Sequence, residues 1–307
     1  MNETLILTVL TIITAATPLV YAAIGELVVE RSGVLNLGVE GMMLVGAVCS
    51  FAAAHYTGFA SAGILAGVVA GILMAALFGF LTLILQSSQV ATGLALTIFG
   101  IGASALIGQP LVGVAYEGLP TLYIPILSDL PLVGRLLFSH DVLVYGSFAL
   151  VAAVAWLLSR SKAGLVLRCV GDSHHAAHAL GIRVIRVRFL ATLFGGACAG
   201  LGGAYLSMVY TPMWVENMSA GRGWIALALV VFAVWQPGRL LFGAYLFGGI
   251  SILQLHAQAL GINVPSQWMS MLPYITTIIV LVLISRDRGR IRRNAPASIG
   301  KAFHPTS

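Results

Sequence analysis

The sequence is poor in charge, in lysine and in any pattern of catalytic residues. Only 8% of its 307 residues are charged, whereas 59% are apolar, and the mean hydropathy is +0.99. Soluble domains are about 45–50% apolar and about 25% charged. The scarcity of charge therefore excludes an ordinary soluble domain and indicates a polytopic membrane protein.

The few lysines and histidines exclude two enzyme classes. A P-loop needs Gly-Lys followed by Ser or Thr, but alanine follows both lysines, Lys162 and Lys301. His174 and His178 are four residues apart, yet no third zinc ligand lies near them and no HExxH motif exists. A solvated helix face explains this pair better. We expect no cofactor in this chain, and a membrane enzyme is disfavoured because no nucleophile–base pair emerges.

Long apolar runs divide the chain into about nine predicted membrane spans. Several windows reach about 18 or more residues with almost no charge, which is enough to span a hydrocarbon core of roughly 30 Å. The runs cover roughly residues 4–28, 34–55, 61–85, 90–108, 142–158, 189–210, 223–235, 240–259 and 268–285. We therefore predict an all-α polytopic membrane protein with a transmembrane domain over 1–285. A broken helix near 30–42 would move the span count within a range of about eight to ten.

Basic residues are concentrated in two stretches. Of the sixteen Lys and Arg residues, twelve lie in 160–188 and 286–301. Such clusters mark the cytoplasmic side of a membrane protein, so the net charge does not indicate nucleic acid. Counting spans places the basic tail 286–307 inside, and the N-terminus and segment 109–141 outside. No removable signal peptide is expected. The tail is either a positive stop signal or a site for anionic membrane lipids.

The third run carries a stripe of small residues at four-residue spacing. Such a stripe lets the backbones of two helices approach closely. Its members are Gly63, Gly67, Gly71, Ala75 and Gly79. We expect another helix to pack against this face.

The polar segment 26–42 interrupts the apolar runs. Glu30 and Arg31 are expected at the inner membrane surface, where charge costs little. Asn36 and Glu40 lie one helical turn apart and can share a face. They either contact a polar solute in a translocation pathway or satisfy backbone groups freed where glycines break the helix. Those glycines are Gly33, Gly38 and Gly41.

The basic loop 159–188 contains a predicted short helix over about 172–182. Asp172 and Ser173 are good N-caps, alanines follow, and a glycine is a plausible C-cap. Its apolar stripe fits a groove in another protein, and an ordinary connector helix is the alternative. The positions of interest are Gly171, Asp172, Ala176, Ala177, Leu180 and Gly181.

A third polar cluster, 211–224, lies at the predicted outer mouth of two spans. Arg222 opens a span between two glycines and has no other cation near it in the sequence. It either pairs with Glu216 or faces a translocation pathway. Asn217 is a second pathway candidate.

Several stretches together resemble one family. Residues 32–43 resemble the Gly-x-x-Asn-x-Gly-x-Glu-Gly signature of permease subunits in nucleoside and simple-sugar ABC importers. These belong to the wider group of branched-chain amino-acid and ribose permeases. Residues 220–248 resemble its late-span motif, and residues 271–274 resemble the start of its last span. Residues 168–182 resemble its coupling loop, although Ser-His stands where Asn-Pro is more usual.

The resemblance implies one transmembrane half of an ATP-driven importer in a bacterial plasma membrane. It is closest to the shorter of two permease paralogues, because no long N-terminal extension is present. It implies that the 172–182 helix couples transport to an ATPase. The implied partners are a second permease in a heterodimer, a cytoplasmic ATPase that holds ATP and Mg²⁺, and an extracytoplasmic solute-binding lipoprotein. The implied solutes are nucleosides first and simple sugars next.

A different class of transporter stays open on the residues alone. An ion-coupled secondary transporter would use acidic groups within the membrane and would work without an ATPase. Its candidate residues are Glu26, Glu30 and Glu40.

Overall fold

The computed structural model describes residues 3–122, 138–259 and 294–304, with isolated positions between 268 and 282. Most of these residues are helical. In the described part of the chain, β-type pairing is limited to isolated bridges of Val112 with Trp214 and Ala115 with Met213. The predicted all-α class is confirmed.

The helices follow the predicted apolar runs closely. They are α1 (Glu3–Arg31), α2 (Val39–Thr57), α3 (Ala60–Gly79), η1 (Phe80–Ile84), α4 (Gln89–Gly108), η2 (Gln109–Leu111), α6 (Val142–Arg160), α7 (Lys162–Asp172), α8 (His174–Ala179), α9 (Val184–Tyr205), η3 (Leu206–Tyr210), α10 (Arg222–Phe232) and α11 (Pro237–Ala259). Among the described residues, seven helices are long and apolar enough to cross a membrane.

Two of the predicted spans differ from this set. The run 223–235 forms α10, which has 11 residues and rises only about 16 Å at 1.5 Å per residue. It is therefore too short to cross a bilayer unaided. Most of the run 268–285, and the basic part of the tail before residue 294, lie outside the described residues.

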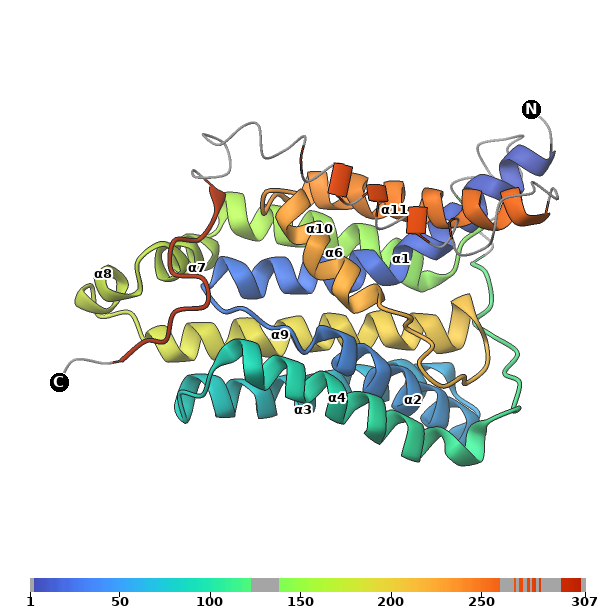
Figure 1. Ribbon diagram of the computed structural model, residues 1–307, viewed down its shortest axis with the longest axis horizontal. Helices are drawn as coiled ribbons and strands as arrows, with labels where there is room; N and C mark the ends of the chain where they lie inside the picture. The colour runs from blue at the N-terminus through green and yellow to red at the C-terminus, as the bar shows by residue number, and fades with distance from the viewer. Residues whose placement is uncertain are drawn as a thin grey trace.

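The connections between helices gather at the two opposite ends of the bundle (Figure 1). One end holds α7, α8, the turn after α1 and the segment 294–304, and a backbone hydrogen bond joins Gly300 N to Gly33 O (3.1 Å). At the other end, Tyr116 N donates to Pro212 O (3.0 Å). Among the described residues, the segments predicted to lie inside thus share one end, and those predicted to lie outside share the other.

The small-residue stripe of α3 packs against α9. A methyl group added at Gly71 would collide with the backbone of Gly196, and one added at Gly200 would collide with the backbone of Gly67. The predicted close approach of two helices is therefore confirmed, and α9 supplies glycines of its own to meet the stripe.

The helix at the centre of the bundle is interrupted where the sequence predicts a break. α1 is buried at every residue from 15 to 30. After Arg31 the chain leaves the helix and runs back along the bundle, and α2 begins only at Val39, part-way along its length (Figure 1). The break is confirmed and comprises residues 32–38.

Candidate functional site

The break segment, residues 32–38, is largely buried, and side chains from neighbouring helices satisfy its backbone. Buried N–H and C=O groups need partners within the protein. A glutamate of α1 and two polar residues of α4 supply them. The bonds run from Leu35 N to Gln89 Oε1 (2.8 Å), from Asn36 N to Glu26 Oε1 (3.3 Å) and from Thr97 Oγ1 to Leu37 O (3.0 Å).

Asn36 lies in the break and is hydrogen-bonded to the N-cap residue of α2. Its side chain is fully buried, at 0% exposure. The amide oxygen Oδ1 accepts a hydrogen bond from the backbone of Gly38 (2.9 Å), which is the N-cap residue of α2, and Nδ2 lies 3.6 Å from the sulfur of Met42. The described contacts of this amide are thus with its own stretch of chain.

Glu40 lies in the first turn of α2 and receives three hydrogen bonds from the start of α10. Oε1 accepts from Ser219 Oγ (2.5 Å) and from Gly221 N (2.8 Å), and Oε2 accepts from Gly223 N (2.5 Å). Helix N-termini expose unpaired N–H groups and a partial positive charge. The buried carboxylate therefore stabilises the start of α10 and ties it to α2.

Two glycines of the family-like signature are required by the local geometry. Gly33 has a φ of +87°, and a methyl group there would lie 2.8 Å from a guanidinium nitrogen of Arg188. A methyl group at Gly41 would lie 2.7 Å from the carbonyl oxygen of Leu96. The first residue permits the turn out of α1, and the second permits α2 to contact α4.

Glu30 and Arg31 lie at the end of α1, but Glu30 is not at a water-exposed surface. Glu30 is 1% exposed, and Trp235 Nε1 donates to its Oε2 (2.6 Å). Arg31 donates to the backbone carbonyls of Trp235 and Asn294 (2.9 Å each). The expectation of a surface position is wrong for Glu30, because the turn between α10 and α11 covers the end of α1.

The three glutamates considered for ion coupling have different surroundings. Both carboxylate oxygens of Glu40 are held by α10, and Glu30 is held by a tryptophan. Glu26 Oε1 accepts a hydrogen bond from Asn36 N in the break segment. Its buried Oε2 has no hydrogen-bond partner among the described residues. All three therefore accept at least one hydrogen bond within the protein, and Glu26 is the one that leaves a buried oxygen unpaired among the described residues.

Arg222 lines a pocket at the opposite end of α10 from Trp235. Its guanidinium lies 4.8 Å from the centre of the Tyr210 ring and donates to the carbonyls of Met218 and Ser219 (3.3 Å each). The pocket has a volume of about 340 Å³. Its other walls come from α1 and α11, including the polar residues Ser251 and Gln254.

The other two candidates of the outer cluster, Glu216 and Asn217, form no ion pair or hydrogen bond with Arg222 among the described contacts. Glu216 is exposed, and within the described chain it forms no ion pair with Arg222. Asn217 is also exposed and adopts a φ of 55°, and its carbonyl accepts from Ala220 N (3.0 Å). Asn217 thus shapes the turn before α10 and does not line the pocket.

The helix predicted over about 172–182 forms as the shorter α8, His174–Ala179, with a cap at each end. Ser173 Oγ accepts from Ala176 N (3.3 Å) and caps its start. Gly181 N donates to His178 O (2.8 Å), and Ile182 N donates to Ala177 O (3.1 Å). This pair of bonds is the Schellman motif that ends a helix at a glycine.

Two faces of α8 differ in exposure. Leu180 is 79% exposed and Ala176 is exposed beside it, whereas Ala177 is 2% exposed and packs inward. Asp172 does not cap α8, because it is the last residue of α7. Gly171 packs against the carbonyl of Arg31 at the end of α1.

His174 is buried, so the interpretation of a solvated histidine face is wrong for this residue. It is 5% exposed, and its Nδ1 lies 3.2 Å from Arg188 Nη2. Burial, together with the positive charges of Arg188, His175 and Lys301, lowers the pKa of His174 to about 4. His174 is therefore neutral at physiological pH and can accept a hydrogen bond.

Several residues that form the hydrogen bonds of this site were not singled out by the sequence. Arg188 lies in a basic stretch that indicated only topology, and Gln89 lies in a polar break between two runs. Thr97 and Ser219 are single hydroxyl residues without a motif. A polar residue inside an apolar run is the signal that could have identified Thr97.

Membrane transport proteins often contain discontinuous helices whose N-termini point at an anionic group. In this protein the N-terminus of α10 points at the buried carboxylate of Glu40 in the first turn of α2. Residues 8–281 match the family described as branched-chain amino acid transport system / permease component. The chain belongs to this family, which confirms the resemblance of its motifs.

Three relatives cover nearly the whole chain. The putative glucose ABC transporter permease TsgC13 of Haloferax volcanii is 40% identical over 94% of this chain and 95% of its own. The nucleoside ABC transporter permease NupC of Lactococcus lactis is 33% identical over 87% and 89%. The guanosine ABC transporter permease NupQ of Bacillus subtilis is 32% identical over 87% and 88%. The chain is thus a multi-pass transport subunit of the nucleoside and sugar ABC importer type.

Proposed function

We propose that this chain forms one half of the translocation pathway of an ATP-driven nucleoside importer, coupled to its ATPase through α8. The coupling part of this proposal is supported by the geometry of α8. It is a short helix, capped at both ends, that presents Ala176 and Leu180 outward at the end of the bundle where the basic loop lies. Such a helix fits a groove in a partner protein.

The proposed partners rest on the family to which the chain belongs and on its relatives, which are named as ABC transporter permeases. A cytoplasmic ATPase holds ATP and Mg²⁺, a second permease completes the pathway as a heterodimer, and a solute-binding lipoprotein delivers the solute from outside. The basic loop and the C-terminal tail face the cytoplasm of a bacterial cell, by the charge rule for membrane proteins.

In this mechanism, closure of the ATPase moves α8 and rocks the helices, so that the pathway opens to each side in turn. Gly171, Asp172, Ala177 and Gly181 form the frame that holds the exposed face of α8. Gly33, Asn36, Gly38, Glu40 and Gly41 form the helix break, and the hydrogen bonds of Asn36 and Glu40 favour this role over solute contact. Arg222 is the pathway candidate that still faces a pocket.

The solute class rests on the relatives. Two of them are named as nucleoside or guanosine permeases. The 40% identical relative is named as a putative glucose permease, which makes a simple sugar the second candidate. Both are neutral, hydroxyl-rich solutes, which an aqueous pocket with a few hydrogen-bonding side chains accommodates.

The coupling role is tested with charge substitutions on α8. The chain is co-expressed with its partner permease, ATPase and binding protein, and uptake of radiolabelled guanosine and glucose by proteoliposomes is measured with ATP hydrolysis. Ala176→Arg with Leu180→Arg should lower uptake by roughly tenfold or more, as when a central interface contact is lost. The complex should still assemble.

The matched control places the same changes on α7. Ala163→Arg with Leu165→Arg also replaces an exposed alanine and an exposed leucine of the basic loop. It should leave uptake within about twofold. Normal uptake in the α8 variant would refute the coupling role, and preference for glucose over guanosine would refute the nucleoside assignment.

A further inference from the structure

The C-terminal segment, remote in sequence from α8, packs against α8 and is hydrogen-bonded to the end of α7 and to the helix break. Here the C-terminal latch means residues 298–303. Ser298 N donates to Gly171 O (2.8 Å), at the end of α7, and Gly300 N donates to Gly33 O (3.1 Å), at the start of the break. Ser298 Oγ also donates to Asp172 O (3.2 Å). Two adjacent turns of the latch therefore hold the coupling loop against the break.

Phe303 anchors the latch on α8. It is 6% exposed and belongs to an apolar cluster with Val170, Ala177 and Val184. The centre of its ring lies 5.4, 6.0 and 5.3 Å from the ring centres of His174, His175 and His178. Aromatic rings at such distances attract each other in addition to the effect of simple burial.

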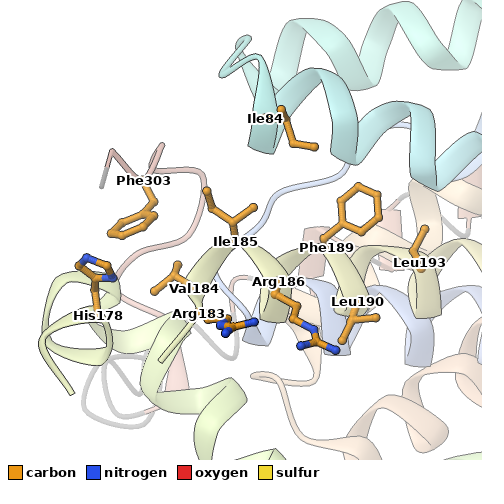
Figure 2. A pocket seen from close by; sticks show the side chains of 10 residues that line it. All are labelled: Ile84, His178, Arg183, Val184, Ile185, Arg186, Phe189, Leu190, Leu193 and Phe303. Carbon is orange, nitrogen blue, oxygen red and sulfur yellow. The ribbon is translucent and has the colours of Figure 1, made fainter. Parts of the chain in front are cut away.

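Phe303 also forms one wall of a groove beside α9. Figure 2 shows Phe303 next to His178, across from Ile185 on α9, with Ile84 of η1 above. The groove has a volume of about 630 Å³. Gln86, just after η1, donates to the carbonyl of Phe303 (3.3 Å). The latch thus contacts α8, α9 and the end of η1 together.

Arg188 of α9 is buried and contacts α8, the latch and the helix break. It is 1% exposed, and its guanidinium donates to Ser32 O (3.2 Å) and Lys301 O (2.9 Å) and lies 3.2 Å from His174 Nδ1. Within the described chain no carboxylate forms an ion pair with it. Guanidinium donors in a fixed planar fork can hold three acceptors at fixed angles, which a lysine cannot do.

We propose that the C-terminal latch and Arg188 transmit movement of α8 to the helix break, with Arg188 as a positioning residue. This proposal rests on the proposed coupling function of α8. The contacts run without a gap from α8 through Arg188 and the latch to Gly33. The break then leads directly to Glu40, which holds α10. Such contiguous bonded elements carry coupling between distant sites.

The test compares latch variants in the assembled importer. Phe303→Ala removes the anchor, and Arg188→Lys keeps the charge but loses the planar fork. Both should lower uptake of radiolabelled guanosine and glucose per ATP hydrolysed by roughly 2- to 30-fold, the range for residues in a coupling network. A purely structural role would lower uptake and ATP hydrolysis in proportion, and would leave their ratio unchanged.

His304→Ala is the matched control, since His304 is the exposed neighbour of Phe303. It should keep the wild-type ratio, and Phe303→Trp should restore most of it. An unchanged ratio in Phe303→Ala and Arg188→Lys, while the α8 arginine variant uncouples, would refute the latch and leave the proposed function intact. Normal uptake in the α8 variant would instead refute the proposed function.

A second measurement needs no partner. In detergent micelles, hydrogen exchange of the full chain should show Phe303→Ala raising amide exchange in both 171–182 and 32–38, with α11 unchanged. Faster exchange confined to 171–182 would contradict the proposed link.

Discussion

Glu40 at the start of α2 caps the start of α10 through the backbone of Gly223, across 183 residues of sequence (2.5 Å). A methyl group at Gly223 would lie 2.5 Å from the Cα of Glu40, so the two helix ends pack as closely as backbones can. The carboxylate is 3% exposed. It takes the place that water would take at a solvated helix end.

Replacing Glu40 should destabilise the protein in proportion to the donors left unpaired. Glu40→Gln retains one carbonyl oxygen but turns an NH₂ group toward a backbone N–H, and should cost about 1–3 kcal/mol. Glu40→Ala leaves three donors without partners and should cost more than Glu40→Gln. Unfolding in detergent measures both. Glu216→Gln, on the exposed part of the same loop, should stay within about 0.5 kcal/mol; an equally small effect at Glu40 would contradict the capping role.

The local features of the break could be predicted from the sequence. Three glycines and two polar residues interrupt an apolar run, and these properties depend only on neighbouring residues. The partner of Glu40 could not be predicted, because it lies on a helix far along the chain. Helical periodicity indicates which face is buried and carries no information on which helix covers it.

At the end of the bundle predicted to be cytoplasmic, local features could likewise be predicted from the sequence, whereas contacts with distant segments could not. The capping residues of α8 followed from local propensity, and Ser173 and Gly181 serve as expected. The sequence favours a solvated helix face for His174 because no third zinc ligand lies near it, and an inner-surface position for Glu30 because it follows the first apolar run. Phe303 and Trp235 cover them, from segments that the local pattern does not connect to them.

Acidification should destabilise the protein through His174. Its pKa in the folded protein is about 4, below the unfolded value of about 6.5. The unfolded chain therefore binds a proton that the folded chain does not. The contribution of neutral His174 to the free energy of unfolding should be fully present above about pH 6.5. It should decrease as the pH drops toward 4, with a slope of at most about 1.4 kcal/mol per pH unit.

Unfolding curves of wild type and His174→Gln between pH 7.5 and 4.5 measure this effect. The variant should show a flatter dependence on pH, and His304→Gln should show the wild-type dependence. A parallel loss of stability in His174→Gln would assign the pH effect to another group.

Adding a side chain between α3 and α9 should destabilise the bundle. Gly71→Ala places a methyl group against the backbone of Gly196 and within 2.9 Å of Gly200 N, and overpacking of this kind typically costs about 1–3 kcal/mol. Gly102→Ala is the control, because a methyl group there meets nothing within 4 Å. It should be neutral or stabilising, since alanine favours helix over glycine by up to about 1 kcal/mol. Equal melting temperatures for the two variants would refute the close contact.

Arg222 should affect transport more than stability, if the pocket beside it lies on the pathway. Its guanidinium is half-buried over Tyr210 and bonded to two carbonyls of the preceding turn. Arg222→Gln should lower uptake of labelled guanosine roughly tenfold or more, because hydrogen bonds from charged groups contribute about 1.5–3 kcal/mol. Arg222→Lys should retain part of the activity, because it keeps the charge and the cation–π contact but loses the fork. Arg239→Gln, at the opposite end of the bundle, should leave uptake within about twofold. A melting temperature that falls in step with uptake in Arg222→Gln would mean that the arginine only holds the turn before α10, and the pathway would have to be sought elsewhere.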